Sequence, residues 1–120
     1  MRMPKRLLVV DDHPAVALAL KVFLRSDGRY EVAKSARTAA EGLEMLGDED
    51  AVLLDLHLPD MSGVELVRAF RAAAPGATLI LHSAADDTPE VEAVRPLVDA
   101  VAAKSGFLEV LDALDRLTAG

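Results

Sequence analysis

The chain is 120 residues long, which suits one compact domain and leaves no room for two. Hydrophobic residues make up 52% of it, so wholesale disorder is excluded, and no apolar run is long enough to cross a bilayer. Cysteine is absent, which excludes disulfides, thiolate zinc sites and cysteine nucleophiles. The net charge of −7, with no basic cluster after the first six residues, argues against a nucleic-acid surface in this chain.

The first ten residues begin basic and turn apolar, as an export signal does. Asp11 and Asp12 end that apolar run before it reaches export length. We therefore expect a cytoplasmic protein that makes no membrane contact.

Apolar runs alternate with helical patterns about five times along the chain, at spacings typical of strands and amphipathic helices. In chain order we expect a strand at 5–10, a helix at 14–26, a strand at 30–34, a helix at 38–47, a strand at 51–55, a helix at 62–74, a strand at 77–82, a helix from 88, a strand at 99–103 and a last helix lined by Phe107, Val110, Leu111, Leu114 and Leu117. Internal repeats, low-complexity segments and linkers are absent from the sequence.

Short motifs indicate where some of these helices begin and end. Thr38-Ala-Ala-Glu41 and Ser62-Gly-Val-Glu65 both have the pattern of a capping box, in which the first and last side chains cap the helix start. Gly63 suits the tight entry to the helix that follows. Pro96 stands inside an apolar pattern, so the end of the fourth helix stays open.

Alternating strands and helices predict a parallel sheet with helices on both faces, an α/β fold built as a three-layer sandwich of five strands and five helices. Ligands of such sheets bind beyond the carboxyl ends of the strands. The first predicted strand is followed by Asp11-Asp12, the third ends in Asp55, and the fourth and fifth are followed by Ser83 and Lys104. We expect these side chains to meet at one edge of the sheet.

These residue types suit one reaction. Neighbouring carboxylates repel each other and ionise more easily around a cation, and hard oxygen ligands favour Mg²⁺ or Mn²⁺. A carboxylate can also attack phosphorus to give an aspartyl phosphate, while an ammonium and a hydroxyl stabilise the transferred group.

The order of these five residues resembles the receiver domains of bacterial two-component response regulators. So do the contexts Leu-Leu-Val-Val-Asp-Asp-His-Pro, Leu-Leu-Asp-Leu-His-Leu-Pro-Asp-Met-Ser-Gly and His-Ser-Ala-Ala-Asp-Asp. The resemblance covers essentially residues 1–120 as one receiver domain. It implies a flavodoxin-like sheet with strand order 2-1-3-4-5, the order for which a chemotaxis regulator of this family is a known example.

The resemblance also implies a role for each site residue. Asp55 accepts the phosphoryl group from a phosphohistidine on a sensor histidine kinase or histidine phosphotransfer protein. Asp12 and Asp55, with the backbone carbonyl of His57, ligate the metal, and Asp11 supports it through water. Ser83 and Lys104 engage the phosphoryl group. Such a domain catalyses at most its own phosphorylation and dephosphorylation.

The three histidines do not have the spacing of a zinc site. We expect His13 to be structural or exposed and His82 to be a core histidine with its hydrogen bonds satisfied. His57 follows the acceptor by two residues and borders the mouth of the site, so a role in controlling water access stays open beside a plain surface position.

The chain matches the receiver pattern at one switch position, Ser83, and departs from it at the other, Val101. Receivers usually carry Tyr or Phe where Val101 stands, and Pro where Ser105 stands. Before the fifth strand receivers usually have a Gly-containing turn, where Pro96-Leu-Val-Asp99 stands here. All three departures lie on the face formed by the fourth helix, fifth strand and fifth helix, where receivers dimerise or dock partners, so a homodimer through this face is an open expectation. A binding module that signals without phosphorylation is the alternative function. An aspartate-nucleophile phosphatase fits less well, because such enzymes usually carry Asp where His57 stands.

Overall fold

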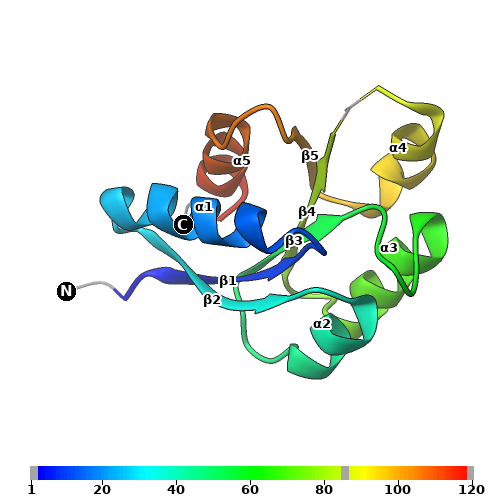
Figure 1. The fold of residues 1–120 in the computed structure, drawn as a ribbon, viewed down its shortest axis with the longest axis horizontal. Helices are drawn as coiled ribbons and strands as arrows, with labels where there is room; N and C mark the ends of the chain where they lie inside the picture. The colour runs from blue at the N-terminus through cyan, green and yellow to red at the C-terminus, as the bar shows by residue number, and fades with distance from the viewer. Residues whose placement is uncertain (1–2, 85–86, 119–120) are drawn as a thin grey trace.

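The computed structural model describes residues 3–84 and 87–118 and has the expected three layers (Figure 1). Its five strands form one parallel sheet in the order β2-β1-β3-β4-β5, which confirms the predicted topology. The strands are β1 (Lys5–Val10), β2 (Tyr30–Ala36), β3 (Ala51–Asp55), β4 (Thr78–Ser83) and β5 (Ala100–Ala103). The helices are α1 (Pro14–Asp27), α2 (Ala39–Met45), α3 (Gly63–Ala73), α4 (Pro89–Val94), the 3₁₀ turn η1 (Arg95–Leu97) and α5 (Leu108–Thr118).

Two hydrophobic clusters cover the two faces of the sheet, because successive residues of each strand point to opposite sides. Leu8 and Leu54 pack with Phe70 and the α2–α3 side, whereas Leu7 and Leu53 pack with the α1–α5 side. All five residues of β3, the central strand, are buried. This burial fixes the register of β3 and so the position of Asp55 at its end.

Several element ends differ from the prediction. β2 continues to Ala36, because every residue of β1 pairs with a residue of β2. β4 extends to Ser83. The helix after Thr38 stops at Met45, two residues early. Pro96 lies in the one-turn η1 that follows α4, which settles the end that the sequence left open.

The two predicted capping boxes have different outcomes. The Thr38 hydroxyl accepts a hydrogen bond from the Glu41 N–H at 3.1 Å, as predicted. Ser62 forms no side-chain cap, so the second prediction is wrong. The backbone around Ser62 pairs with His57 instead, while Gly63, at a φ of +65°, donates its N–H to the Leu56 carbonyl. The tight entry predicted at Gly63 is confirmed.

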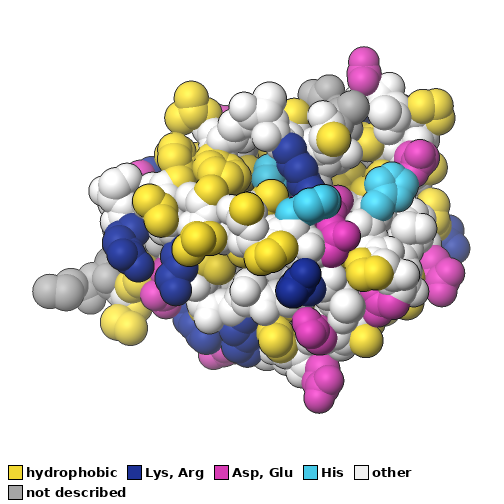
Figure 2. Space-filling view, in the orientation of Figure 1, with side chains coloured by type: hydrophobic (Ala, Val, Ile, Leu, Met, Phe, Trp, Pro, Cys, Tyr) yellow, Lys and Arg dark blue, Asp and Glu magenta, His cyan; other side chains and the backbone are white. Residues whose placement is uncertain are grey.

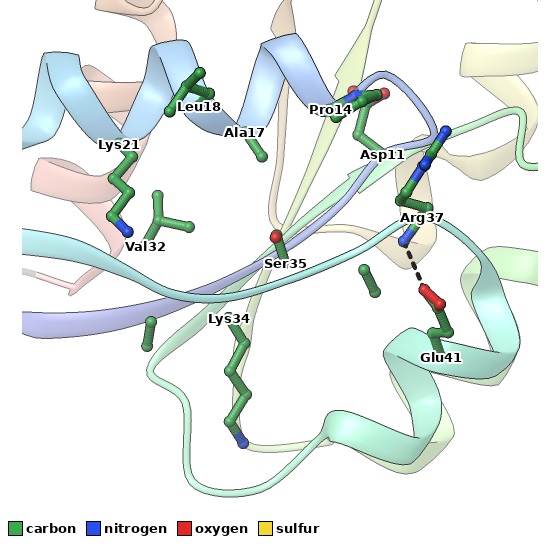
Figure 3. Close-up of a pocket in the computed structure, with 12 residues that line it drawn as sticks. Asp11, Pro14, Ala17, Leu18, Lys21, Val32, Lys34, Ser35, Arg37 and Glu41 are labelled. Atoms are coloured by element: carbon green, nitrogen blue, oxygen red, sulfur yellow. Dashed lines mark hydrogen bonds between the residues drawn. The ribbon is translucent and has the colours of Figure 1, made fainter.

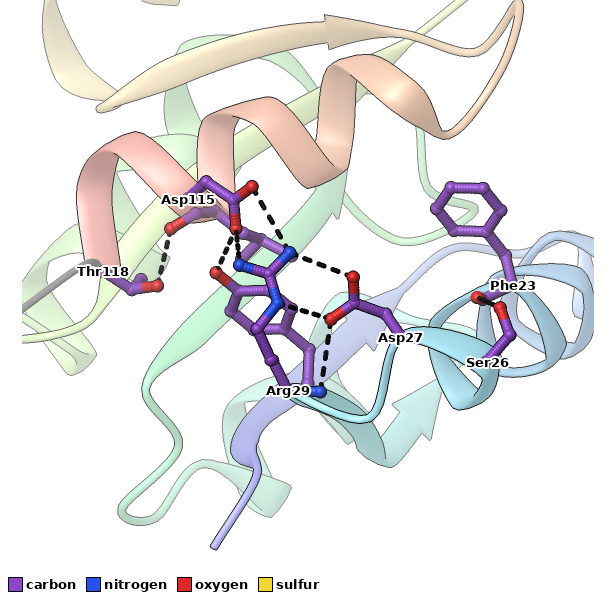
Figure 4. Close-up of polar contacts among 8 residues, drawn as sticks. Phe23, Ser26, Asp27, Arg29, Asp115 and Thr118 are labelled. Atoms are coloured by element: carbon purple, nitrogen blue, oxygen red, sulfur yellow. Dashed lines mark hydrogen bonds and ion pairs between the residues drawn. The ribbon is translucent and has the colours of Figure 1, made fainter. Parts of the chain in front are cut away.

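The last helix is fastened to the start of β2 by polar contacts (Figure 4). Asp115 of α5 accepts a hydrogen bond from the Tyr30 hydroxyl at 2.6 Å and pairs with Arg29 at 2.9 Å. Arg29 also pairs with Asp27 at the end of α1. α1, β2 and α5 therefore share one network on this face of the sheet. Among the described residues, no helix is both long and apolar enough to cross a membrane.

Candidate functional site

The residues singled out by the sequence converge at the carboxyl edge of the sheet. Asp11 and Asp12 follow β1, Asp55 ends β3, Ser83 ends β4 and Lys104 follows β5. Asp11, Asp55 and Ser83 are buried, with 4%, 7% and 8% of their surfaces exposed. Strands of a parallel sheet end at the same edge, which explains why residues from four strands meet there.

Lys104 lies between two of the acids. Its Nζ is 2.8 Å from Asp11 Oδ2 and 3.3 Å from Asp55 Oδ2. The backbone N–H of Lys104 donates to the Ser83 carbonyl at 2.8 Å, so the end of β4 fixes the position of the lysine backbone. The ammonium is thus positioned to pair with whatever negative charge occupies Asp55.

Burial and charge act against each other in this cluster. Burial, the largest influence, raises the pKa of Asp55; Lys104 partly offsets it, and the charge of Asp11 adds to it. Burial also favours the neutral form of Asp11, but Lys104 and His13 outweigh it and hold the pKa of Asp11 below its ordinary value. Burial by itself would lower the pKa of Lys104, but the charges of Asp11 and Asp55 outweigh it and raise this pKa above its ordinary value. Asp55 therefore lacks a full counter-charge.

The donor set of this edge fits a divalent cation. Ligand atoms of Asp11, Asp12, His13 and Asp55 all lie within 4.8 Å of one another. Asp11 Oδ2 and Asp12 Oδ1 are shielded from solvent, yet neither accepts a well-directed hydrogen bond from the described residues. Orphaned buried carboxylate oxygens are costly unless a cation satisfies them. Mg²⁺ and Mn²⁺ suit such oxygen ligands.

His13 is the member of this cluster that sequence reasoning missed. Its side chain is 67% exposed, as expected, but Nδ1 reaches back to lie 3.0 Å from Asp11 Oδ1 and 3.1 Å from Asp12 Oδ1. The sequence did contain a signal for this position, because His13 directly follows two acids at the end of a predicted strand.

The loop between Asp55 and α3 is held on both sides. Asp60 accepts hydrogen bonds from the N–H groups of Ala39 and Ala40 at 2.9 and 3.0 Å, at the start of α2. On the other side His57 Nε2 lies 2.9 Å from Glu90 Oε2 in the first turn of α4. The His57 ring therefore pairs with α4, while its backbone N–H is 3.5 Å from Asp55 Oδ1, and a role of the ring in controlling water access stays a prediction.

His82 is buried, with 2% of its surface exposed, but neither ring nitrogen has a hydrogen-bond partner within the described part of the chain. The expectation of a satisfied core histidine is therefore wrong. Its ring lies 6.2 Å from that of Phe107. Burial, with the nearby charge of Lys104, lowers the pKa of His82 to about 4, so the ring is neutral near pH 7.

A groove of about 400 Å³ opens beside the site, between α1 and β2 (Figure 3). Ala17, Leu18 and Lys21 line one wall, and Val32 and Ser35 line the other. The groove borders Asp11, but Asp55 and Lys104 do not line it. The space-filling view shows histidine, acidic and basic side chains together near the middle of this face, with hydrophobic side chains gathered over α1 (Figure 2). The acceptor edge and the groove are therefore neighbouring but separate features.

Comparison with known sequences agrees with this geometry. The response regulator receiver domain family matches residues 7–105. The nitrate/nitrite response regulator protein NarP of Escherichia coli is 32% identical over 107 residues, which is 88% of this chain and 47% of NarP. The DNA-binding response regulator MtrA of Mycolicibacterium smegmatis is 38% identical over 94 residues, which is 74% of this chain and 39% of MtrA. The chain thus spans less than half the length of these relatives.

A solved structure shares both the fold and a substantial part of the sequence. The response regulator protein TrrA of Thermotoga maritima, in complex with Mg²⁺-BeF, is 32% identical, with a TM-score of 0.81 over 94% of this chain and 98% of that one. That relative holds a divalent metal together with a fluoride of beryllium.

Proposed function

Because this chain belongs to the response regulator receiver domain family, we propose that it is a signalling switch in which Asp55 accepts a phosphoryl group from a phosphohistidine. The donor is a sensor histidine kinase or a histidine phosphotransfer protein, the partner class of receiver domains. We assign residues 1–120 to one receiver domain. The observation that carries the proposal is the ion-pair cluster itself: a buried aspartate, incompletely neutralised, with an ammonium 3.3 Å away and a second acid beyond it.

The chemistry assigned to each side chain follows from its position. An Asp55 carboxylate oxygen attacks phosphorus as the phosphorus–nitrogen bond of the donor histidine breaks, and the donor imidazole keeps the bonding pair. Lys104 pairs with the transferred group, and the Ser83 hydroxyl donates a hydrogen bond to one of its oxygens. Asp12, Asp55 and the His57 carbonyl hold Mg²⁺ or Mn²⁺, with Asp11 supporting it; the ion supplies the counter-charge that transfer between anions needs.

Phosphorylation at a defined residue tests the proposal. The protein is incubated with acetyl phosphate and Mg²⁺, and the intact mass is measured. We expect one phosphoryl group, labile to hydroxylamine, in the wild type and in the control Asp112→Asn, whose carboxylate is exposed on α5. We expect none in Asp55→Asn and none after chelation of the metal. Modification of Asp55→Asn to the wild-type level contradicts the assignment.

The response to phosphorylation depends on what this domain contacts. NarP and MtrA are response regulators more than twice as long as the part they share with this chain, and MtrA is named a DNA-binding regulator. We propose that phosphorylation of this domain changes its interactions with a partner or an attached output domain, and that the receiver itself does not bind nucleic acid.

A further inference from the structure

We infer that the imidazole of His13 is a ligand of the divalent metal and gives this receiver a mixed nitrogen–oxygen site. The inference rests on the proposed function, because it concerns the same metal. It adds a residue whose side chain the receiver assignment leaves without a role. His13 Nδ1 is one of the four ligand atoms that lie within 4.8 Å of one another.

The spacing of the donor atoms supports a shared ion. Nδ1 is 3.0 Å from Asp11 Oδ1 and 3.1 Å from Asp12 Oδ1. Ligands at right angles around a metal, each about 2.1 Å from it, are about 3.0 Å apart. Nδ1 and Asp12 Oδ1 therefore already stand at the separation expected of two adjacent ligands, while Asp11 Oδ1, 3.0 Å from Nδ1, belongs to the acid that supports the ion through water.

The buried oxygens beside His13 supply an independent reason for a cation. Asp11, whose side chain is 2% exposed, has an Oδ2 that meets Lys104 as an ion pair without a well-directed hydrogen bond. Asp12 Oδ1 is shielded from solvent, accepts no well-directed hydrogen bond from the described residues and lies 3.1 Å from His13 Nδ1. One ammonium serves Asp11 and Asp55, so the cluster of three acids keeps excess negative charge where His13 points into it.

In this structure His13 Nδ1 forms a hydrogen bond with Asp11 Oδ1 at 3.0 Å, so ligation through Nδ1 exchanges this hydrogen bond for a bond to the metal. His13 is the residue before α1, in an extended conformation, and its side chain does not cap the helix. Its backbone N–H donates to Asp11 Oδ1 at 2.9 Å, which fixes the turn that brings the ring back toward the acids. Exposure of the ring means that ligation requires no rearrangement of the core.

A nitrogen ligand changes which metal the site prefers. Mg²⁺ favours oxygen ligands, whereas imidazole suits Ni²⁺, Zn²⁺ and similar ions, whose affinity also exceeds that of Mn²⁺. We therefore expect His13 to contribute strongly to Ni²⁺ binding, detectably to Mn²⁺ binding and little to Mg²⁺ binding.

The direct test is pulsed electron paramagnetic resonance of Mn²⁺ bound to the full chain. A nitrogen ligand gives a ¹⁴N modulation of the spin echo, which we expect in the wild type and not in His13→Ala. The matched control is His57→Gln, which removes another exposed imidazole near Asp55 but keeps the backbone carbonyl; its ¹⁴N modulation should equal that of the wild type. Calorimetry should show about a tenfold loss of Ni²⁺ affinity in His13→Ala and less than about a threefold change for Mg²⁺.

Circular dichroism of the metal-free variant checks that His13→Ala folds. Should that variant fail to fold, His13→Gln, which keeps a polar side chain of similar reach, replaces it in both measurements. Wild-type Mn²⁺ without ¹⁴N modulation, or modulation that survives in the His13 variant, overturns the inference while leaving the phosphorylation of Asp55 untouched. Failure of the wild type to bind any divalent ion overturns it together with the metal-dependent function.

Discussion

Asp11 and Asp12 are adjacent in the chain but lie in different surroundings. Asp11 is buried, pairs with Lys104 and accepts the His13 N–H, whereas the Asp12 side chain is 37% exposed and faces the open side of the cluster. Asp12 is therefore freer than Asp11 to turn a carboxylate oxygen toward a metal. The charge of Asp11 is already paired with Lys104.

This difference predicts unequal metal affinities. Asp12→Ala should weaken Mg²⁺ binding about tenfold more than Asp11→Ala, because the first removes a direct ligand and the second a supporting charge. Isothermal titration calorimetry of both variants and the wild type measures the losses. Equal losses would contradict the assignment of Asp11 to a supporting position.

His82 is buried and neutral, and its two ring nitrogens have no hydrogen-bond partner among the described residues, which costs stability. In the unfolded chain an imidazole takes up a proton near pH 6.5, but in the fold it stays neutral until about pH 4, because burial opposes the charge. Between these values the unfolded state binds more protons, so stability falls as pH falls. Above them the contribution is constant.

His82→Leu should remove this part of the pH dependence. The wild type should lose about 2 kcal/mol through this group between about pH 7 and about pH 5, and the variant should lose correspondingly less. The variant should also be at least as stable at neutral pH, since Leu fills the site without unpaired polar atoms. Urea unfolding at several pH values measures both. Parallel pH profiles for the two proteins would show that the buried ring does not titrate in this way.

At the level of elements, the sequence patterns predicted the presence of helices and strands better than the residues at which they begin and end. The apolar run of β3 was long, continuous and buried, and its predicted bounds are the observed ones. The Ser62 motif matched a capping box, but the tight turn at Gly63 and the backbone pairing of His57 with Ser62 set the start of α3 instead. Tertiary pairing also extended β2 to Ala36. The extension of β2 depends on a strand that is distant in sequence, and the start of α3 depends on a loop conformation that the capping motif does not encode.

The junction of β2 with α5 offers a test of one such distant contact. Tyr30→Phe removes only the hydroxyl that donates to Asp115 at 2.6 Å and keeps the ring, which is buried. We expect a loss of about 1.5–3 kcal/mol in the free energy of unfolding, the usual range for a hydrogen bond to a charged group. Asp112→Asn, on the same helix, changes a side chain that is 72% exposed and pairs with Arg116, so it should change the free energy of unfolding far less. Chemical denaturation gives both values, and equal effects would argue against a special role for the Tyr30 contact.

Across the whole molecule, the sequence predicted the fold and which strands would deliver the site residues, because strand order and strand ends determine that edge. It could not show that Lys104 stands closer to Asp11 than to Asp55, or that His13 turns back toward the acids. Those facts depend on side-chain directions set by burial and by turns. Predictions about the site were therefore stronger for the identity of residues than for their pairing.

The face formed by α4, β5 and α5 lacks the ring that receivers usually carry at the switch position, and the turn between α4 and β5 is held by polar contacts. Val101, on β5, is half-buried against the α2–α3 cluster and carries no ring. In addition, Arg71 of α3 donates to the Leu97 carbonyl at 3.1 Å and pairs with Asp99 at 2.9 Å, which fastens the turn between α4 and β5. Asp99 in turn accepts the Leu79 N–H at 2.8 Å. One end of α4 is thus fixed, whereas at its first turn Glu90 pairs with His57 of the acceptor loop.

We therefore predict that phosphorylation couples weakly to this face. Coupling needs contacts that differ between two states, and a small branched side chain beside a fastened turn offers few. Beryllofluoride and Mg²⁺ should shift amide resonances around Asp55, Ser83 and the first turn of α4, with small shifts over β5 and α5 and little ligand-induced dimerisation in sedimentation. Val101→Tyr introduces a ring at the switch position. It should enlarge the shifts over α5 if the small Val101 side chain, and not the turn held by Arg71, limits the coupling. Large shifts across residues 89–118 of the wild type, with strong dimerisation, would show that the ring is dispensable and that Ser83 reaches this face through other contacts.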